Sequence, residues 1–339
     1  MKRRFLATAC GWAALTLLAG ACGTTEEPRA STGSQPPATE VAGCAGVKTS
    51  SGPVKLTDGF GRQVELAQPA QRVAVLEWQQ TEDVLTLCAS PVAVADPKGY
   101  ALWDTAEKLP DGVADVGKRG EPNLDALYAT NPDLVIVEAS SASDEIIGKL
   151  EPRGVPVLAT KGADVADPVK NMLDTFSLIG AALGRSERAT QVTDTFKSHL
   201  AEAKQAVAGG GATKFVYFDG YVQGGNVTLR PFGQGSLIGE LGEALGLTNA
   251  WTGEVDEQYG LGQTDIEGMS TVGDATLIYT GTKDPESDVA AEVAKNPIWP
   301  SLPAVKEGRI HAFPPGIWTF GGPRSSIQVL EAYVGLLTS

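Results

Sequence analysis

A loop that leads into a predicted helix carries the residues best suited to chemistry in this chain. Residues 116–125 read Val-Gly-Lys-Arg-Gly-Glu-Pro-Asn-Leu-Asp. Asn123 is a favourable helix N-cap, and Asp125 then lies in the first turn, where the helix dipole favours an anion. Pro122 stiffens the helix entry, so the loop can hold Arg119 out as a fixed cation for oxygen atoms of a ligand. The alternative is an ordinary strand-to-helix loop with a solvated arginine and aspartate.

Patterns typical of catalysis are weak in comparison. The two histidines, His199 and His311, are too few for a histidine-based zinc cluster. Residues 233–239 imitate a glycine-rich dinucleotide loop but lack the third-glycine spacing, so helix capping by Ser236 is favoured there. A G-x-S-x-G nucleophile elbow is absent from the sequence. These absences argue against a zinc enzyme, a dinucleotide-dependent enzyme and a serine hydrolase.

The first 21 residues have the pattern of a lipoprotein signal peptide. Cations at positions 2–4 precede an apolar stretch over 5–19 that is too short to span a bilayer stably, and small residues then precede Cys22. We expect cleavage before Cys22, lipidation of that cysteine, and a flexible tether over residues 22–53. The protein would then be anchored on the outer face of the cytoplasmic membrane. A plain secretory signal is the alternative, and the sequence leaves Sec or twin-arginine export open.

Charge and cysteine content limit the partners and the compartment. The formal net charge is −14, and it becomes −17 once the three leader cations are removed. Such an acidic chain is repelled by phosphate backbones, so we expect no nucleic-acid partner. With Cys22 lipidated, Cys44 and Cys88 remain as one pair in an oxidising compartment, and we predict a disulfide between them. The alternative is that Cys88 is a buried thiol.

The middle of the chain alternates between strand and helix patterns. A predicted hairpin at 55–65 comes first. The predicted strands are 72–76, 91–95, 133–137, 155–158, 214–218 and 275–280. The predicted helices between and after them are 81–87, 123–129, 143–150, 236–245 and 323–337, with a long helical passage over 168–208. This order predicts an α/β fold with two lobes of mainly parallel sheet, at 54–167 and 209–339.

The loop at residues 116–125 resembles a loop of the siderophore-binding proteins of ABC importers, particularly the ferric hydroxamate and ferric dicitrate binders. The stretches 249–254 (Asn-Ala-Trp-Thr-Gly-Glu), 259–267 and 317–322 (Ile-Trp-Thr-Phe-Gly-Gly) are also similar to this family. Together the matches cover most of residues 54–338. The resemblance implies that 168–208 is a helical spine between two lobes. It also implies a binding protein rather than an enzyme. This protein would be a monomer that captures a ferric siderophore, with hydroxamates as the first choice, and delivers it to an ABC permease.

The resemblance also implies roles for individual residues. Arg119 would lie in the ligand cleft, and Asp125 and Glu267 would face the permease from the outer surfaces of the lobes. Aspartate at 125, where glutamate is usual, shortens the reach but keeps the charge. The cleft would be walled by aromatic side chains and a second cation, for which the candidates are Trp78, Tyr100, Trp103, Arg230, Tyr259, Trp318 and Phe320.

A ferric siderophore is a bulky chelate whose iron is already saturated, so the protein need supply no metal ligand or cofactor. It needs an aromatic wall and one or two cations aimed at the chelating oxygens. Cobalamin or heme capture on the same scaffold is the second interpretation. A secreted α/β enzyme is a distant third.

Overall fold

The computed structural model describes residues 43–209, 213–223 and 226–338. The predicted signal peptide, the lipidation of Cys22 and most of the tether predicted over 22–53 lie outside these residues. In the part of the chain that is described, no helix is both long enough and apolar enough to cross a membrane.

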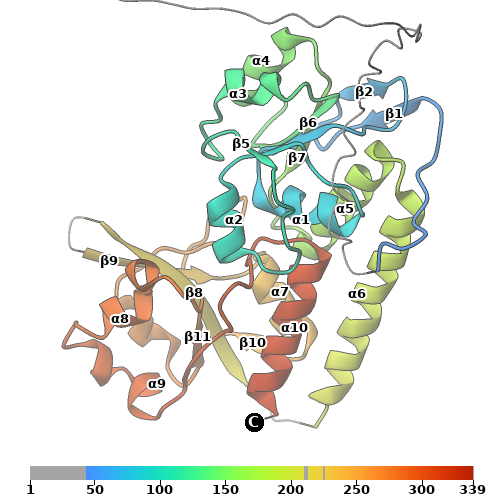
Figure 1. Ribbon diagram of the computed structural model, residues 1–339. Coiled ribbons are helices and arrows are strands. Elements are labelled where there is room, and N and C mark those ends of the chain that lie inside the picture. The colour runs from blue at the N-terminus through green and yellow to red at the C-terminus, as the bar shows by residue number, and fades with distance from the viewer. Residues whose placement is uncertain (1–42, 210–212, 224–225, 339) are drawn as a thin grey trace, which may run out of the picture. The chain divides into compact units, whose positions relative to one another are not determined.

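The N-lobe, which holds strands β1 to β7, begins with the predicted antiparallel hairpin of β1 (Val54–Thr57) and β2 (Gln63–Leu66). A parallel sheet follows in the order β5-β4-β3-β6-β7 (Figure 1). Its strands are β3 (Val73–Val75), β4 (Ala93–Val94), β5 (Ala114–Asp115), β6 (Leu134–Ala139) and β7 (Val157–Lys161). The strand order reverses between β3 and β6, and a crevice forms at the carboxyl ends of the strands at such a point.

Both faces of this sheet are buried, as expected for parallel strands covered by helices. Consecutive residues of β6, such as Leu134 and Val135, belong to two different hydrophobic clusters, one on each face of the sheet. The N-lobe helices are α1 (Trp78–Thr86), α2 (Pro97–Trp103), α3 (Leu124–Ala129) and α4 (Glu145–Leu150), with the 3₁₀ turn η1 (Glu151–Arg153). Asn123 caps α3 as predicted, because its side-chain oxygen accepts a hydrogen bond of 3.0 Å from the Ala126 N–H.

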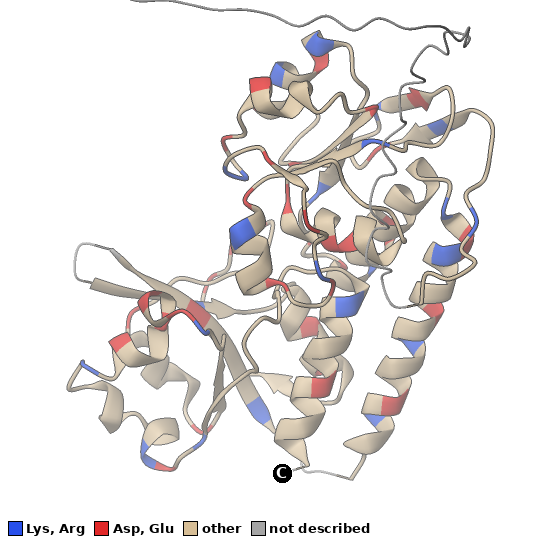
Figure 2. Cartoon of the chain, viewed as in Figure 1, with Lys and Arg blue, Asp and Glu red and all other residues tan. Residues whose placement is uncertain are grey.

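Two long helices, α5 (Pro168–Ala182) and α6 (Ser186–Ala206), follow the first sheet. Each contributes to two hydrophobic cores. Met172 of α5 and Phe196 of α6 pack in the core of the second lobe, whereas Phe176 and Val192, one turn away in each helix, pack in the core of the first. Charged residues of both signs are spread along α6 (Figure 2). The helix pair is therefore part of both lobes rather than a simple connection.

The C-lobe is built on a second sheet with strand order β10-β8-β11-β12, all parallel, and with β9 antiparallel to β8. The strands are β8 (Lys214–Gln223), β9 (Asn226–Phe232), β10 (Thr248–Asn249), β11 (Thr276–Tyr279) and β12 (Ile310–Ala312). The helices are α7 (Leu237–Ala244), α8 (Val289–Val293), α9 (Pro303–Lys306) and α10 (Pro323–Leu337), with the 3₁₀ turns η2 (Gly268–Val272), η3 (Pro285–Ser287) and η4 (Trp299–Ser301). The sequence analysis missed β9.

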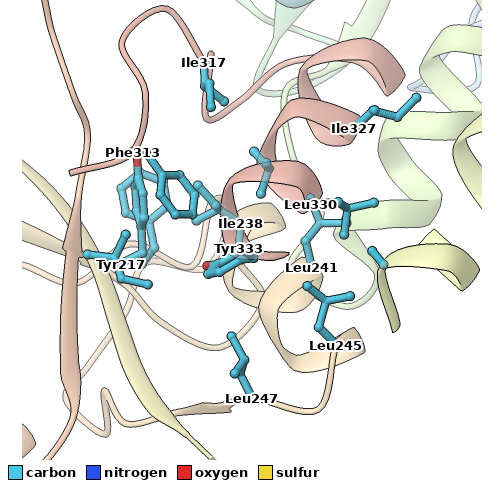
Figure 3. Close-up of a cluster of buried hydrophobic side chains, with 14 of the residues drawn as sticks. Tyr217, Ile238, Leu241, Leu245, Leu247, Phe313, Ile317, Ile327, Leu330 and Tyr333 are labelled. Atoms are coloured by element: carbon cyan, nitrogen blue, oxygen red, sulfur yellow. The ribbon is translucent and has the colours of Figure 1, made fainter. Parts of the chain in front are cut away.

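Figure 3 shows the core between this sheet and its helices. Tyr217 of β8, Phe313 after β12 and Tyr333 of α10 pack together there, and the ring centroids of Phe313 and Tyr333 lie 4.9 Å apart. The Tyr333 hydroxyl donates a hydrogen bond of 3.1 Å to the carbonyl oxygen of Ile238 in α7. These contacts hold α7 and α10 against one face of the sheet.

Glu82 of α1 links the two lobes. Its buried carboxylate accepts hydrogen bonds of 3.0 Å each from the backbone N–H groups of Gly322, Arg324 and Ser325, and one of 2.6 Å from the Ser325 hydroxyl. These groups form the N-terminus of α10, where Gly322 has no side chain with which to cap the helix. The side chain of an N-lobe residue therefore supplies the capping acceptors for a C-lobe helix.

More buried charge surrounds this junction. Arg324 is a cation in the first turn of α10, where the helix dipole disfavours positive charge. It lies 3.4 Å from a carboxylate oxygen of Glu107, and this ion pair accounts for its position. Burial raises the pKa of Asp83 and of Asp104 well above the usual aspartate range, and repulsion from Glu82 raises both further. Burial and this repulsion both favour the protonated forms of the two aspartates, in which neither side chain repels Glu82.

The predicted disulfide between Cys44 and Cys88 is present, with Cα atoms 5.5 Å apart. It joins the segment before β1 to the end of α1. The same segment is held further by a hydrogen bond of 2.9 Å from the Ser50 N–H to the Gly184 carbonyl oxygen, in the turn between α5 and α6. The N-terminal arm is thus fixed to the first lobe from residue 44 onward.

Candidate functional site

Two adjoining cavities lie where the lobes face each other. The inner chamber, of about 250 Å³, is lined by Glu77, Gln79, Arg119, Glu138, Arg230, Tyr259, Leu261, Trp318 and Phe320. The outer chamber, of about 440 Å³, is lined by sixteen residues that include Trp78, Trp103, Asp219, Tyr221 and Val222. Arg119, Arg230 and Trp318 line both chambers. The cleft therefore draws on both lobes, and on strand ends near the reversal of each sheet.

Arg119 is held by a tight loop. Gly117 adopts a positive φ of 93°, which a side chain would disfavour, and the Asn123 N–H donates a hydrogen bond of 2.7 Å to the Val116 carbonyl oxygen. The guanidinium then lies 2.5 Å from a carboxylate oxygen of Glu77 and 3.8 Å above the ring of Trp78. An ion pair and a cation–π contact fix it in the cleft before any ligand binds.

Four aromatic rings form a continuous wall across the cleft. The Trp78 and Trp318 ring centroids are 4.8 Å apart, those of Trp318 and Phe320 are 5.3 Å apart, and those of Phe320 and Tyr259 are 5.6 Å apart. All three pairs are edge-to-face, which is a favoured geometry for aromatic contacts. Trp78 comes from the N-lobe, and the other three come from the C-lobe.

Arg230 is presented by the hairpin of β8 and β9. Its cross-strand neighbour is Asp219, and the guanidinium binds both carboxylate oxygens, at 2.7 and 2.5 Å. Burial raises the pKa of Asp219, although the two bonds from Arg230 oppose this effect. Arg230 therefore lies in the cleft with its charge already matched by an acid.

Glu138, at the end of β6, contacts Tyr259 of the opposite lobe, whose hydroxyl donates a hydrogen bond to the carboxylate. Burial and the nearby charge of Glu77 raise the pKa of Glu138 to about 7, while Tyr259 and Arg119 act in the opposite direction. Burial and Glu138 also raise the pKa of Tyr259, so its phenol stays protonated and acts as the donor. This is a direct side-chain link across the cleft.

Acidic groups outnumber basic ones around the cleft. Among the described residues that line the two chambers, the cations are Arg119 and Arg230. The acidic residues are Glu77, Glu138, Asp219, Glu286, Asp288 and Glu292. Because both arginines are already paired with acids, the cleft offers no excess of positive charge.

The structure brings most of the predicted site residues together, with one exception. Trp78, Trp103, Arg119, Arg230, Tyr259, Trp318 and Phe320 all line one or both chambers. Tyr100 does not, and the prediction that it forms part of the cleft wall is wrong. Its side chain is 1% exposed, packs in a core behind Trp78, and donates a hydrogen bond of 2.7 Å to the Glu107 carbonyl oxygen. Helix α2, which the sequence analysis missed, turns Tyr100 inward.

The sequence analysis missed several polar residues of the cleft, among them Glu77, Gln79, Glu138 and Asp219. Glu77 follows β3, and Glu138 lies near the carboxyl end of β6. These are the two neighbouring strands between which the strand order reverses. Polar residues at the carboxyl ends of such strands commonly bind ligands, so this position was an available signal. Asp219 was hidden because its strand was predicted to end at residue 218.

The proposed docking residues lie away from the chambers. The Asp125 side chain is 92% exposed in the first turn of α3, 3.4 Å from Arg153. Glu267 is exposed immediately before η2. Their role in docking stays a prediction.

The chambers also have a defined chemical character. In the described part of the chain, no group of three or more His, Cys, Asp or Glu residues is placed to hold a metal ion. The cleft supplies aromatic faces, two guanidinium groups and several carboxylates. Such a lining suits a large ligand bound through stacking and hydrogen bonds.

Comparison with known proteins agrees with this geometry. Residues 73–315 match the periplasmic binding protein family. The iron(3+)-hydroxamate-binding protein FhuD of Escherichia coli is 27% identical over 277 residues, covering 78% of this chain and 87% of the relative. The Fe(3+) dicitrate-binding periplasmic protein FecB of the same organism is 22% identical over 259 residues, covering 75% of this chain and 80% of the relative.

Solved structures share the fold. The siderophore-binding protein FhuD from Vibrio cholerae, bound to Fe3+–Desferal, superposes with a TM-score of 0.68 at 24% identity, covering 79% of this chain and 98% of the other. The triscatecholate siderophore-binding protein FeuA from Bacillus subtilis gives a TM-score of 0.64 at 18% identity, covering 84% and 98%. The predicted two-lobed α/β fold is confirmed, as is the prediction of a binding protein rather than an enzyme. The chain belongs to the periplasmic binding protein family.

Proposed function

We propose that this protein captures a ferric hydroxamate siderophore outside the cytoplasmic membrane and delivers it to an ABC permease. The protein would act as a monomer, and lipidation at Cys22 would hold it on the outer face of that membrane. The observation that carries the proposal is the cleft, where an aromatic wall and two fixed guanidinium groups meet at the boundary between the lobes. Relatives named as binders of iron(3+) hydroxamate and of Fe(3+) dicitrate support a ferric chelate as the ligand.

The charge of the cleft favours hydroxamates among these chelates. A ferric tris-hydroxamate centre is neutral, because three singly charged groups balance the iron, whereas catecholate and citrate complexes are anionic. Six acidic residues and two arginines line the chambers, and each arginine is paired with one of the acids, so the acids in excess would repel an anionic complex. Repulsion is strong in a partly desolvated cleft, where charges are poorly screened.

The test is a titration panel that follows tryptophan fluorescence, since Trp78 and Trp318 lie in the cleft wall. The ligands are ferric hydroxamate, catecholate and citrate complexes, together with heme and cobalamin. We expect the hydroxamates to bind most tightly. Tighter binding of heme or cobalamin would replace the proposed ligand class, and a preference for the anionic complexes would refute the charge argument.

Replacing Arg119 by alanine should weaken binding of a ferric hydroxamate about ten- to a hundred-fold. A partly desolvated, charge-assisted hydrogen bond contributes about 1.5–3 kcal/mol, which converts to that range. Arg119→Lys should recover only part of the loss, because an ammonium cannot fork across two oxygens. Lys118→Ala, in the same loop but exposed, is the matched control and should be nearly silent. Unchanged affinity in Arg119→Ala would remove this residue from the site.

Replacing both Asp125 and Glu267 by lysine should reduce uptake in cells about ten-fold or more while leaving chelate affinity within a few-fold, because neither residue lines a chamber. Single replacements should act weakly, as exposed ion pairs do. A matched control makes the same charge change elsewhere, at Glu202 of α6 and Glu331 of α10, both exposed. Equal uptake by the two double variants would mean that the permease docks on another surface.

A further inference from the structure

Glu138 is a carboxylate without a cation of its own. The other acid of the inner chamber, Glu77, pairs with Arg119, and the second arginine of the chamber, Arg230, pairs with Asp219. Among the residues that the structure describes, no Lys, Arg or His comes within ion-pair distance of Glu138, and its bonded partner is the neutral Tyr259 hydroxyl. A buried carboxylate in this position gains most from a ligand that carries a positive charge.

Gln79 gives a second, independent sign that the inner chamber is built for a ligand. It lies in the first turn of α1 and lines the same chamber, and its side chain is only 3% exposed. Its side-chain nitrogen has no hydrogen-bond partner in the described structure. An unpaired buried amide donor is costly, so a ligand that supplies a carbonyl oxygen would be favoured here.

We propose that Glu138 and Gln79 form a sub-site for a polar arm of the siderophore, in which Glu138 binds a protonated amine and Gln79 donates to a carbonyl oxygen. This inference rests on the proposed function and narrows it to amine-bearing hydroxamate chelates. The arm would enter beside Tyr259 and take over its hydrogen bond to Glu138. The chelate itself would lie against Trp78 and Trp318, next to Arg119.

The experiment compares two ligands that differ only in this charge. One is the ferric complex of a linear trihydroxamate with a terminal primary amine, and the other is the same complex with its amine acetylated. The parent protein should bind the amine form about ten-fold more tightly, as expected for one charge-assisted hydrogen bond. Equal binding of the two forms would overturn the sub-site. If neither form binds while a catecholate or citrate complex does, the proposed function itself fails.

Variants then assign the preference to particular residues. Glu138→Gln keeps an acceptor for Tyr259 but removes the charge, so the amine form should lose its advantage and the ratio of the two affinities should fall to about one. A merely structural role would weaken both ligands equally and would contradict the proposal. Gln79→Leu should weaken both ligands several-fold, and no change in either would remove Gln79 from the sub-site. Glu145→Gln, an exposed acid of α4, is the control and should keep the full preference.

The pH dependence provides a further check. Glu138 is faced by Glu77, Arg119, Arg230 and Tyr259, and its pKa is about 7. The carboxylate attracts the amine only when it is ionised, so the preference should be full near pH ~8 and should shrink toward pH ~6. In Glu138→Gln the ratio of the two affinities should not change over this range. A parent ratio that is constant with pH would count against Glu138 as the counter-charge.

Discussion

Replacing Glu82 by alanine should lower the free energy of unfolding by about 3–5 kcal/mol, the largest effect that we expect from a single substitution. The carboxylate accepts four hydrogen bonds from the N-terminus of α10. Alanine would leave these donors unpaired in a buried junction, where each unpaired polar group costs about 1–3 kcal/mol and water can satisfy only some of them. Denaturant unfolding followed by tryptophan fluorescence and circular dichroism measures the change.

Glu331→Ala provides the control, because Glu331 is exposed on the same helix and its loss should change stability by no more than about 0.5 kcal/mol. Glu82→Gln should fall between the two variants, since an amide keeps one acceptor oxygen but places a donor against the N–H groups of α10. A Glu82→Ala protein as stable as the parent would show that the cap across the lobes contributes little.

Removing the disulfide should have the second largest effect. The Cys44→Ser, Cys88→Ser double variant should lose about 3–4 kcal/mol of stability, because the bond closes a loop of 44 residues in the unfolded chain. Oxidised and reduced parent protein, compared by denaturant unfolding, should differ by a similar amount. The serine variant should not respond to reductant. A parent protein with equal stability in both redox states would contradict this prediction.

The fold was readable from sequence wherever burial imposes a simple pattern. The strand predicted at 133–137 is apolar from Leu134 onward because both faces of the first sheet are covered, and such runs predict buried parallel strands. The cap at Asn123 was also predicted, since capping depends on residues adjacent in sequence. Strand β9 was missed because Arg230 and Pro231 interrupt its apolar pattern, although Gly224-Gly225 between two alternating runs is a hairpin signal.

The site was predicted only in part, for a physical reason. Arg119 and the aromatic residues stood out through local motifs, whereas Glu138 matters because Tyr259, 121 positions later, lies against it. No local pattern reports such a contact. The prediction that Tyr100 lines the cleft was wrong because a local signal was overlooked. Asp96 and Pro97 form a helix start, and the helix directs the Tyr100 side chain into the core. Sequence alone gave the residue types, and only the three-dimensional arrangement gave their partners.

The sharing of α5 and α6 between two cores bears on how the protein can be divided. Helix α5 presents Phe176 to the first lobe and Met172 to the second. Helix α6 presents Val192 to the first lobe and Phe196 to the second, about one turn apart. A fragment that ended before α5 would lack a large part of its apolar core, and a fragment that began after α6 would lack the corresponding part of the other. Neither lobe is therefore expected to fold when expressed alone, and native-state amide exchange should find the centres of both helices among the last regions to open. Two lobes that look like separate domains would then behave as one cooperative folding unit.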